Sequence, residues 1–497
     1  MKMKNIKLNI CRALLVITML ITVSCDKFLD YPPTKNSQIE VKKIEHLDAL
    51  IVGMSTYTSN NAAALCSDLS GYTTTQYNLA SGNMMGWNVL KYYLYNMEAL
   101  ANTVTSIPSY SQIFVANTVL GYVDKVEGDA LEKENIKAEA HFLRALHNWE
   151  VLNTYCLPYS VENEDELGLP KKATTSFEES LERLTLKETY DNVESDIIEA
   201  LKIKRTDLDR RWRASLPAVQ AFAARFYLFK HNYDEAIKYA NLALAANSQL
   251  VDYNTEMRYA TRTVSTSRGQ LYVPYTYYLS SATSPDYDPT AALKWKEVYY
   301  IYDFNYGMWY NPSQYMVDLY DQTNDWRFIY FFVEDYTWVM NMSFSWYGYS
   351  YFGSSIPMGP TVLEMLLIKA ECQARKGEYL ESMNTLNILR SKRMKPGAHV
   401  NLTAANKNDA ILKVIDERTR ELTWAMRFFD IRRYNNNETT IDDVIVKKTY
   451  FPNDGVDVDK TKTPIEYALT VKDRRFAMPF PANDVKLSNG QLIQNTY

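Results

Sequence analysis

The sequence predicts a mostly α-helical fold, in which a superhelix of helix-turn-helix repeats supports a loop-rich, aromatic-rich second half with little β-structure. Glycine contributes only 16 of 497 residues, about 3% against a usual share of about 7%, which disfavours turn-rich all-β folds. Apolar residues recur with helical spacing in several segments, and two pairs of these segments resemble each other. Hydrophobic residues make up 46% of the chain, enough for a sizeable core, which excludes global disorder.

The first 24 residues are predicted to be a secretory signal that is removed. Basic residues and no acidic one precede an apolar run at 13–23, which is too short to span a bilayer. The junction Thr-Val-Ser-Cys resembles a bacterial lipobox, although Thr22 stands where leucine is more usual. Cys25 is therefore the expected lipidation site. An ordinary signal peptide with an incidental cysteine is the alternative.

Charge and cysteine usage argue against two classes of protein. Loss of residues 1–24 removes four of the 54 basic residues and none of the 59 acidic ones, so the mature chain carries a formal charge of −9. Nucleic-acid binders normally present a basic face, so we expect no nucleic-acid partner. Cys66, Cys156 and Cys372 remain as an odd number at wide spacing, which indicates neither a disulfide framework nor a zinc site.

Two helix-turn-helix pairs are predicted. Residues 215–230 begin with Ser215 as a suitable N-cap, and a second helix at 233–246 follows after a short break. The segments 362–375 and 378–392 repeat this arrangement. The aligned positions are Tyr233 with Tyr379, Ala224 with Ala370, and Leu242 with Ile388.

This pattern is typical of tetratricopeptide-type repeats, which have about 34 residues per unit. Alanine at a helix crossing lets two backbones approach closely, and large residues fill the space alongside. A further helix at 136–152 is expected to form the first half of another unit. Unrelated amphipathic helices that share small residues by chance are the alternative.

An ordered set of motifs runs along the chain. Its members are CDKFLDYPPT (25–34), AEAHFLRAL (138–146), LLIKAECQARKGEYLESMNTLNILRSKR (366–393), ERTRELTWAMRFFDIRRY (417–434), FAMPFP (476–481) and QLIQNTY (491–497). Together they resemble the SusD/RagB family of bacterial outer-membrane nutrient-binding lipoproteins. Two departures are His141, in place of the usual arginine, and Trp424-Ala425-Met426, where the family often has a Glu-Gly step.

The resemblance implies a non-enzymatic protein anchored by lipid to the outer membrane, usually facing outward. Such proteins cover a SusC-like TonB-dependent β-barrel transporter, bind an oligosaccharide or polysaccharide, and deliver it to the barrel. Capture of a peptide or another nutrient by the same architecture is the alternative. The expected organisation is a signal peptide (1–24), a tether (25–36), an N-terminal half with helical repeats (37–250), and a C-terminal half (251–497) with aromatic-rich loops (251–360) and late repeat helices (361–434).

The aromatic side chains of residues 272–352 are candidates for ligand binding. This stretch holds 28 aromatic residues in 81 positions, interrupted by glycine, proline and asparagine, so loops or short strands are expected. A flat ring can stack on the apolar C–H face of a sugar while neighbouring polar groups bind its hydroxyls. Filling of the core by many of these rings is the alternative. The candidates are Trp309, Trp326, Trp338, Trp346, Tyr347 and Tyr349.

Trp87 is a further candidate. It lies in a Gly/Asn-rich segment at 81–90, before a helical run expected at 89–104. The resemblance implies a binding role here, because binding loops in members of the SusD/RagB family often come from this neighbourhood. A hydrophobic staple on the following helix is the alternative.

Charged residues crowd one predicted helix at 417–434. Pairs three residues apart, such as Arg418 with Glu421, share a helix face. The resemblance favours a structural ion-pair network that ties this helix to the repeats over a ligand or phosphate site, because the family carries the same signature in members with different ligands. The residues concerned are Glu417, Arg418, Arg420, Glu421, Arg427, Asp430, Arg432 and Arg433.

Motifs for enzymatic or metal chemistry are missing. The five histidines form no His-Glu-x-x-His set, and neither a Gly-x-Ser-x-Gly elbow nor a phosphate-binding Gly-x-x-x-x-Gly-Lys loop occurs. Residues 284–290 and 318–325 could offer oxygen ligands to calcium, but they lack EF-hand spacing, and turns are expected there. We therefore expect no enzyme and no cofactor, with calcium as the one open possibility.

Overall fold

The computed structural model describes residues 41–54, 58–59, 62–75, 86–266, 269–278, 295–304, 311–334, 346–348 and 356–497. The chain divides into two compact units, residues 1–42 and 43–497, and every element below belongs to the second. The predicted signal, Cys25 and the tether lie outside the described residues. None of the described helices combines the length and the apolar character that a membrane crossing needs.

The first helices of the unit pack side by side. Helix α8 (Ala130–Tyr155) contacts α7 (Ser109–Tyr122) on one side and α9 (Leu186–Ala200) on the other, and α3 (Ile44–Met54) packs against α7 and α8. Thr185 and Glu188 form a capping box that starts α9. The helix predicted at 136–152 is therefore present and longer than expected.

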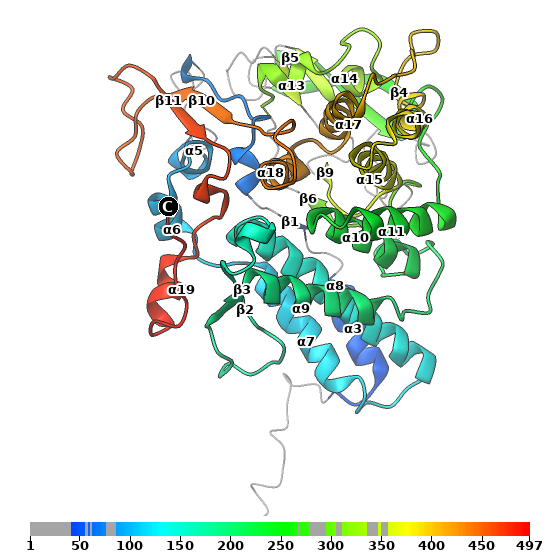
Figure 1. Cartoon of the computed structure of the whole chain (residues 1–497), viewed down its shortest axis with the longest axis vertical. Helices are drawn as coiled ribbons and strands as arrows, with labels where there is room; N and C mark the ends of the chain where they lie inside the picture. The colour runs from blue at the N-terminus through cyan, green and yellow to red at the C-terminus, as the bar shows by residue number, and fades with distance from the viewer. Residues whose placement is uncertain are drawn as a thin grey trace, which may run out of the picture. The chain divides into compact units, whose positions relative to one another are not determined.

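The two predicted repeat pairs continue this array. Helix α10 (Leu216–Phe229) packs on α11 (Tyr233–Ala246), α11 on α15 (Val362–Arg375), and α15 on α16 (Tyr379–Arg390). Figure 1 shows the green pair α10 and α11 between the cyan helices and the yellow pair α15 and α16. The predicted mostly helical repeat fold is confirmed.

The two repeats turn in the same way. His231 and Gly377 both adopt left-handed backbone conformations, with φ of 57° and 88°. The residue after each donates a backbone hydrogen bond to the last turn of the preceding helix. The Asn232 N–H donates to the Tyr227 carbonyl and the Glu378 N–H donates to the Gln373 carbonyl, both at 2.9 Å. This is the Schellman pattern of helix termination. The aligned Ala224 and Ala370 are fully buried, as close helix packing requires, whereas the aligned Leu242 and Ile388 are exposed.

The prediction of one helical run at 89–104 is wrong. It forms two short helices, α5 (Trp87–Tyr93) and α6 (Met97–Thr103). Tyr95 between them is left-handed, with φ of 57°, and Asn96 starts the second helix by accepting a hydrogen bond from the Ala99 N–H at 2.9 Å.

The single helix predicted at 417–434 is also divided. Helix α17 (Lys407–Glu421), which packs on α15 and α16, ends at Leu422, and α18 (Thr423–Tyr434) begins there. Leu422 has φ of −106° and ψ of 33°, outside the helical range. The break lets Arg418 of α17 donate to Asp430 of α18, with Nε 2.8 Å from Oδ2.

The crowded charges on α17 and α18 are mainly buried and structural, as predicted. Glu417 accepts hydrogen bonds from Arg327, Arg390 and Arg420, each at 2.8 Å. Arg433 binds both oxygens of Glu371, at 2.6 and 2.7 Å. Buried ions need such partners, because removal from water is costly.

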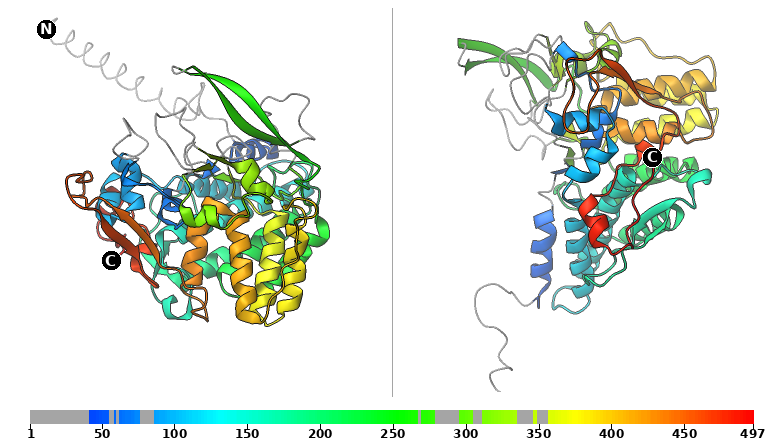
Figure 2. Two further views of the ribbon diagram at one scale, coloured as in Figure 1. Left: turned by 90° about the horizontal axis from the view of Figure 1, so that it is seen from above. Right: turned by 90° about the vertical axis from the view of Figure 1, so that its left-hand side faces the viewer.

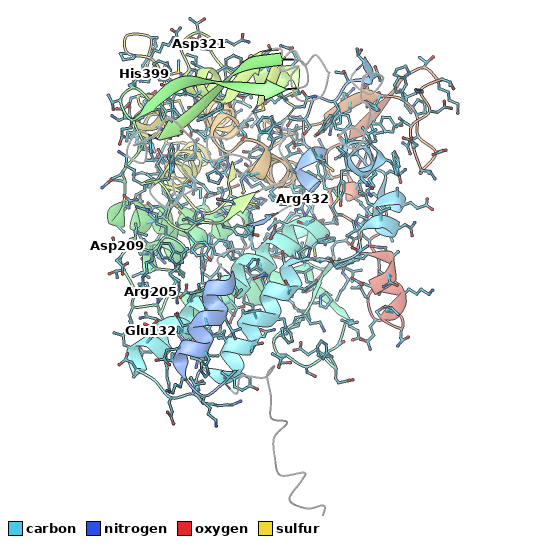
Figure 3. The ribbon with its side chains drawn as sticks, turned by 180° about the vertical axis from the view of Figure 1, so that it is seen from behind. Glu132, Arg205, Asp209, Asp321, His399 and Arg432 are labelled. Carbon is cyan, nitrogen blue, oxygen red and sulfur yellow. The ribbon has the colours of Figure 1, made fainter. Side chains whose placement is uncertain are left out.

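Two buried arginines, Arg205 and Arg432, are labelled in Figure 3, and they differ in their surroundings. Arg205 forms ion pairs with Glu139 at 2.9 Å and with Glu132 at 3.5 Å, which join the segment before α10 to α8. Arg432 is 1% exposed and donates to the Cys156 carbonyl. Burial lowers its pKa to about 10, although Tyr190 and Cys156 act to raise it.

The β-structure of the described residues is limited to short pairs and one long hairpin, as predicted. Strand β6 pairs parallel with β1 and antiparallel with β9, and the other pairs are antiparallel hairpins or ladders. The hairpin β4–β5 extends away from the helices in Figure 2. The strands are β1 (Thr58–Ser59), β2 (Leu167–Pro170), β3 (Arg183–Thr185), β4 (Met257–Thr266), β5 (Gly269–Tyr278), β6 (Asp303–Phe304), β7 (Phe332–Glu334), β8 (Trp346–Gly348), β9 (Ile356–Pro357), β10 (Val446–Tyr450) and β11 (Ile465–Leu469).

Short helices complete the described part of the chain and carry two small apolar clusters. One cluster joins α5 and η1 to β10 and includes Tyr72, Tyr93 and Tyr450. The other includes Tyr253, Trp295 and Tyr330. The short helices are η1 (Ala62–Cys66), η2 (Val161–Asn163), α13 (Gln314–Asp318), α14 (Trp326–Phe331), η4 (Arg474–Phe476) and α19 (Ala482–Leu487).

Candidate functional site

An open cleft of about 730 Å³ lies where distant parts of the chain meet. Its walls come from segment 68–73 after η1, Tyr93 of α5, segment 311–317 at the start of α13, Arg427 of α18, and segment 443–449 leading into β10. The size lies within the range of small-molecule binding sites. We therefore take this cleft as the candidate functional site.

Backbone hydrogen bonds join two of these walls. The Gly71 N–H donates to the Asn311 carbonyl at 2.9 Å, and the Asn311 side-chain amide donates to the Gly71 carbonyl at 2.8 Å. Below them, the Ser313 N–H donates to the Leu69 carbonyl at 2.8 Å, and its hydroxyl donates to the Asp68 carbonyl at 2.6 Å. Two loops about 240 residues apart in sequence thus form one surface.

Gly71 is required by this close approach. A β-carbon at this position would lie 2.5 Å from the Pro312 carbonyl oxygen and 2.6 Å from the Ser313 Cα. Both are backbone atoms that cannot rotate away. Glycine is therefore the residue that lets the two loops meet.

Arg427 and Asp68 form a charged pair in the cleft wall. The guanidinium binds both carboxylate oxygens, with Nε at 2.8 Å and Nη2 at 2.6 Å. Such fork-like pairing fixes the geometry of both side chains. Arg427 also donates to the Thr419 hydroxyl at 3.1 Å, so the pair ties segment 68–73 to the repeat helices.

Tyrosine rings form the apolar part of the cleft. Tyr72 and Tyr93 are buried and meet edge to face at 5.1 Å, and the Tyr93 hydroxyl donates to the Tyr72 carbonyl at 3.0 Å. Tyr315 is different, because 41% of its surface is exposed. Its hydroxyl accepts a hydrogen bond from Arg427 at 3.4 Å, which orients the ring at the cleft wall.

Lys448 is a buried residue that contributes to the cleft wall. Its Nζ donates to the Leu65 carbonyl at 2.6 Å and lies 4.0 Å from the Tyr93 ring centroid and 5.0 Å from that of Tyr95. These are cation–π distances. Burial lowers the pKa of Lys448 from 10.5 to about 7, although Cys66 and Asp68 act to raise it.

The groups of the cleft suit a particular kind of ligand. Tyr315 offers an exposed aromatic face, and Ser70, Thr73 and Gln314 offer hydroxyl and amide groups. Such a mixture can bind a molecule that has both apolar faces and hydroxyl groups.

The structure places the sequence-predicted aromatic residues in different surroundings. Trp87 starts α5 and packs, half buried, against the cluster that holds Tyr72 and Tyr93. Trp326 starts α14, stacks on Tyr330 at 5.1 Å, and donates to the Asn254 side chain at 2.7 Å. Neither ring lines the 730 Å³ cleft.

The remaining candidates are described only in part or not at all. Trp346 and Tyr347 lie in β8, opposite Glu334 and Val333 of β7, so the predicted extended backbone is present at these positions. Trp309, Trp338, Tyr349 and Cys25 lie outside the described residues. Their predicted roles stay predictions.

Sequence reasoning named Arg427, as a member of the charged set at 417–434, but it did not single out Tyr315, Lys448 or Asp68. Tyr315 lies inside the predicted aromatic-rich stretch, so composition pointed to its neighbourhood. Lys448 lies between Val446 and Tyr450, and this alternating pattern is a signal for an inward-facing lysine. Nothing in the sequence pairs Asp68 with Arg427, because 359 residues separate them.

The predicted turn at 318–325 is present. The Asp321 carboxylate accepts hydrogen bonds from the Thr323 and Asn324 N–H groups, both at 3.0 Å, and Asp325 binds Arg327. Residues 284–290 lie outside the described part. Among the described residues, no group of three or more His, Cys, Asp or Glu side chains is arranged to hold a metal ion.

A helical-repeat scaffold that carries an open, partly aromatic cleft defines a class of ligand-binding protein. Two family models identify the family within this class. A model described as "Starch-binding associating with outer membrane" matches residues 27–228, and the SusD family model matches residues 363–497. The chain belongs to the SusD/RagB family.

Solved structures of other proteins share the fold. A SusD superfamily protein from Bacteroides thetaiotaomicron has 18% identity and a TM-score of 0.66, with 92% of this chain and 100% of that one covered. A putative sugar-binding protein from Bacteroides vulgatus has 17% identity and a TM-score of 0.64, covering 92% and 99%. A laminarin-binding SusD-like protein has 14% identity and a TM-score of 0.57, covering 91% and 99%. None of the curated proteins matches the chain in sequence.

Proposed function

We propose that the protein binds a glycan in the cleft between segments 68–73 and 311–317, and delivers it to a SusC-like TonB-dependent transporter without catalysing a reaction. The observation that carries the proposal is the exposed ring of Tyr315, oriented by Arg427 beside hydroxyl and amide groups. A sugar presents an apolar C–H face to such a ring and hydroxyls to the polar groups.

The rigidity of the wall favours this role. Tyr315 lies in α13, whose N-cap Ser313 is bonded to segment 68–73, and Arg427 holds the Tyr315 hydroxyl while bound to Asp68. The ring is thus partly fixed before the ligand arrives. A preoriented aromatic side chain loses little conformational entropy on binding.

Family membership supports the remaining parts of the proposal. One matching family model is described as starch-binding and associated with the outer membrane, and a SusD-like protein of the same fold is described as laminarin-binding. We therefore propose a lipid anchor at Cys25, attachment to the outer membrane facing outward, and a transporter barrel as partner. Trp87, Trp326, Trp346 and Tyr347 remain proposed ligand contacts, as do Trp309, Trp338 and Tyr349.

Affinity gels that contain single polysaccharides test the proposal. The mature chain without lipid, residues 26–497, should be retarded by one class of glycan. Tyr315→Ala should weaken this binding by about 1–3 kcal/mol, the range for loss of an aromatic anchor. Tyr122→Ala is the matched control, because Tyr122 on α7 is 42% exposed and does not line the cleft.

Two outcomes would contradict the proposal. Equal binding by Tyr315→Ala and the wild type, with both folded, would remove the cleft from the binding site. Retardation by no polysaccharide, together with binding of peptides, would move the function to the peptide alternative.

A further inference from the structure

The geometry points to an acidic glycan as the ligand: we infer that the cleft accepts an anionic group of the saccharide, a carboxylate or a sulfate, beside Lys448. This inference rests on the proposed function and adds the charge of the ligand to it. It depends on the burial of Lys448, the partners of its ammonium group, and the charges of the cleft wall.

Lys448 is placed inside by the alternation of β10. Val446, Lys448 and Tyr450 are buried, whereas Lys447 and Thr449 are exposed. A lysine on the buried face of a strand is unusual, because lysine is almost never buried without an ionic partner. Lys448 is 5% exposed, and it contributes to the cleft wall.

The ammonium group of Lys448 has neutral partners. Within the described residues it donates to the Leu65 carbonyl and lies over the rings of Tyr93 and Tyr95. No described carboxylate lies within 4.0 Å of it. The Asp68 carboxylate, which also lines the cleft, already accepts two hydrogen bonds from Arg427. A buried cation is thus left without full compensation of its charge.

The cleft wall as a whole carries more positive than negative groups. Arg427, Lys447 and Lys448 face Asp68 and Asp443, on a chain whose formal net charge is −5. Arg427 and Asp68 compensate each other, and Lys447 is paired with Glu466 outside the cleft. Lys448 is thus the cation of the cleft wall that no described carboxylate pairs at ion-pair distance, and such a charge favours an anionic ligand.

An anionic group on the sugar would complete this arrangement. It would provide the counter-charge that the described residues do not, and a charge-assisted hydrogen bond is stronger than one to a neutral hydroxyl. A bound anion would favour the protonated form of Lys448 and would partly restore the pKa that burial lowers. Tyr315 would meanwhile stack on the ring of the same saccharide.

Matched polymers that differ only in charge test the inference. The probes are polygalacturonate and its carboxyl-reduced form, and chondroitin sulfate and its desulfated form, with laminarin, starch and mannan as uncharged polysaccharides. The mature wild-type chain should bind at least one charged polymer ten-fold or more tightly than its charge-depleted counterpart. The two pairs distinguish a carboxylate from a sulfate as the recognised group.

Two variants assign the effect to Lys448. Lys448→Met keeps the length of the side chain and removes the charge, and it should reduce binding of the charged polymer at least ten-fold. Lys462→Met removes the same charge from an exposed lysine that does not line the cleft, and it should change binding less than two-fold. The comparison of polymers on the wild-type chain does not depend on whether Lys448→Met folds.

The possible failures are distinguishable. If an uncharged polysaccharide is the strongest ligand, or if charge removal leaves the affinity unchanged, the inference is overturned and glycan binding stands. If Lys448→Met folds and keeps the full preference for the charged polymer, the site of recognition is not Lys448. If none of the charged or uncharged polymers binds, the proposed function fails, and the inference fails with it.

Discussion

Gly71 is a residue of the cleft wall that leaves no room for a side chain. Two backbone atoms lie within 2.6 Å of the place where a β-carbon would stand, so alanine forces segments 68–73 and 311–313 apart. The hydrogen bonds between Gly71 and Asn311 would then lengthen or break.

Gly71→Ala should therefore weaken glycan binding at least ten-fold and lower stability by about 1–3 kcal/mol, the range for overpacking. Gly121→Ala is the control, because Gly121 lies in α7 with open space around its position; it should leave binding unchanged. Titration calorimetry and urea denaturation measure both effects. Full binding by Gly71→Ala would mean that the joined loops are not the ligand site.

Lys448 makes a pH-dependent contribution to stability. Its folded pKa of about 7 is below its ordinary value of 10.5, so between these values the unfolded chain binds more protons than the folded chain. The penalty for the buried charge is complete below about pH 7 and is relieved as pH rises. The groups around it that also carry or acquire charge are Cys66, Asp68, Tyr93 and Tyr95.

The stability of the wild type relative to Lys448→Met should therefore rise between pH 7 and 10, by up to about 1.4 kcal/mol per pH unit. Urea denaturation of both proteins at several pH values measures this difference. The surrounding groups are present in both proteins, so the difference between the two proteins reports on Lys448. A difference that stays flat with pH would show that Lys448 remains protonated throughout.

At the scale of the elements, the two repeats turn through left-handed residues that differ in kind. Gly377 adopts φ of 88° without a side chain, whereas His231 adopts φ of 57° as a non-glycine residue. A left-handed conformation costs an ordinary residue about 1–2 kcal/mol. The position of Gly377 has open space around it, so substitution there isolates the backbone cost.

Gly377→Ala should lower the free energy of unfolding by about 1–2 kcal/mol, while Gly121→Ala, within a helix, should raise it by about 0.5–1 kcal/mol. Urea denaturation at constant pH measures both. Equal effects of the two substitutions would contradict the assignment of Gly377 to a strained turn. Glycan binding should be unaffected in either variant, because neither residue lines the cleft.

The helices whose boundaries could be predicted from sequence are those whose ends are set by nearby residues. The boundaries of α11 and α15 follow from helical periodicity and from the break residues, and both agree with the structure. The break after α5 depends instead on tertiary contacts, such as the Asn96 amide donating to the Asn453 side chain at 2.8 Å. The break between α17 and α18 similarly accompanies the pairing of Arg418 with Asp430.

The candidate site was less predictable than the fold, because it too depends on contacts between distant parts of the chain. Tyr315, Arg427 and Lys448 meet only after chain segments more than 100 residues apart have folded together. Composition indicated an aromatic-rich region, but not which ring is exposed. The tryptophans that composition favoured include Trp326, whose ring is engaged by Tyr330 and Asn254.

At the scale of the whole molecule, membrane attachment should depend on the sulfur atom of Cys25. Cys25→Ala removes the thiol that would carry lipid, so the protein should move from the membrane fraction to the soluble fraction. Cys66 is a suitable control, because it is fully buried and burial raises its pKa to about 12; Cys66→Ala should leave attachment unchanged. Cell fractionation with metabolic labelling by a fatty acid measures both. Persistent lipid labelling of Cys25→Ala would contradict the anchor.

The most direct test of the central claim is a crystal structure of residues 26–497 with an oligosaccharide of the polymer that binds best. We expect a sugar ring stacked on Tyr315, with its polar groups near Arg427 and its anionic group at Lys448. A saccharide bound only elsewhere on the protein, with the cleft between segments 68–73 and 311–317 empty, would contradict it.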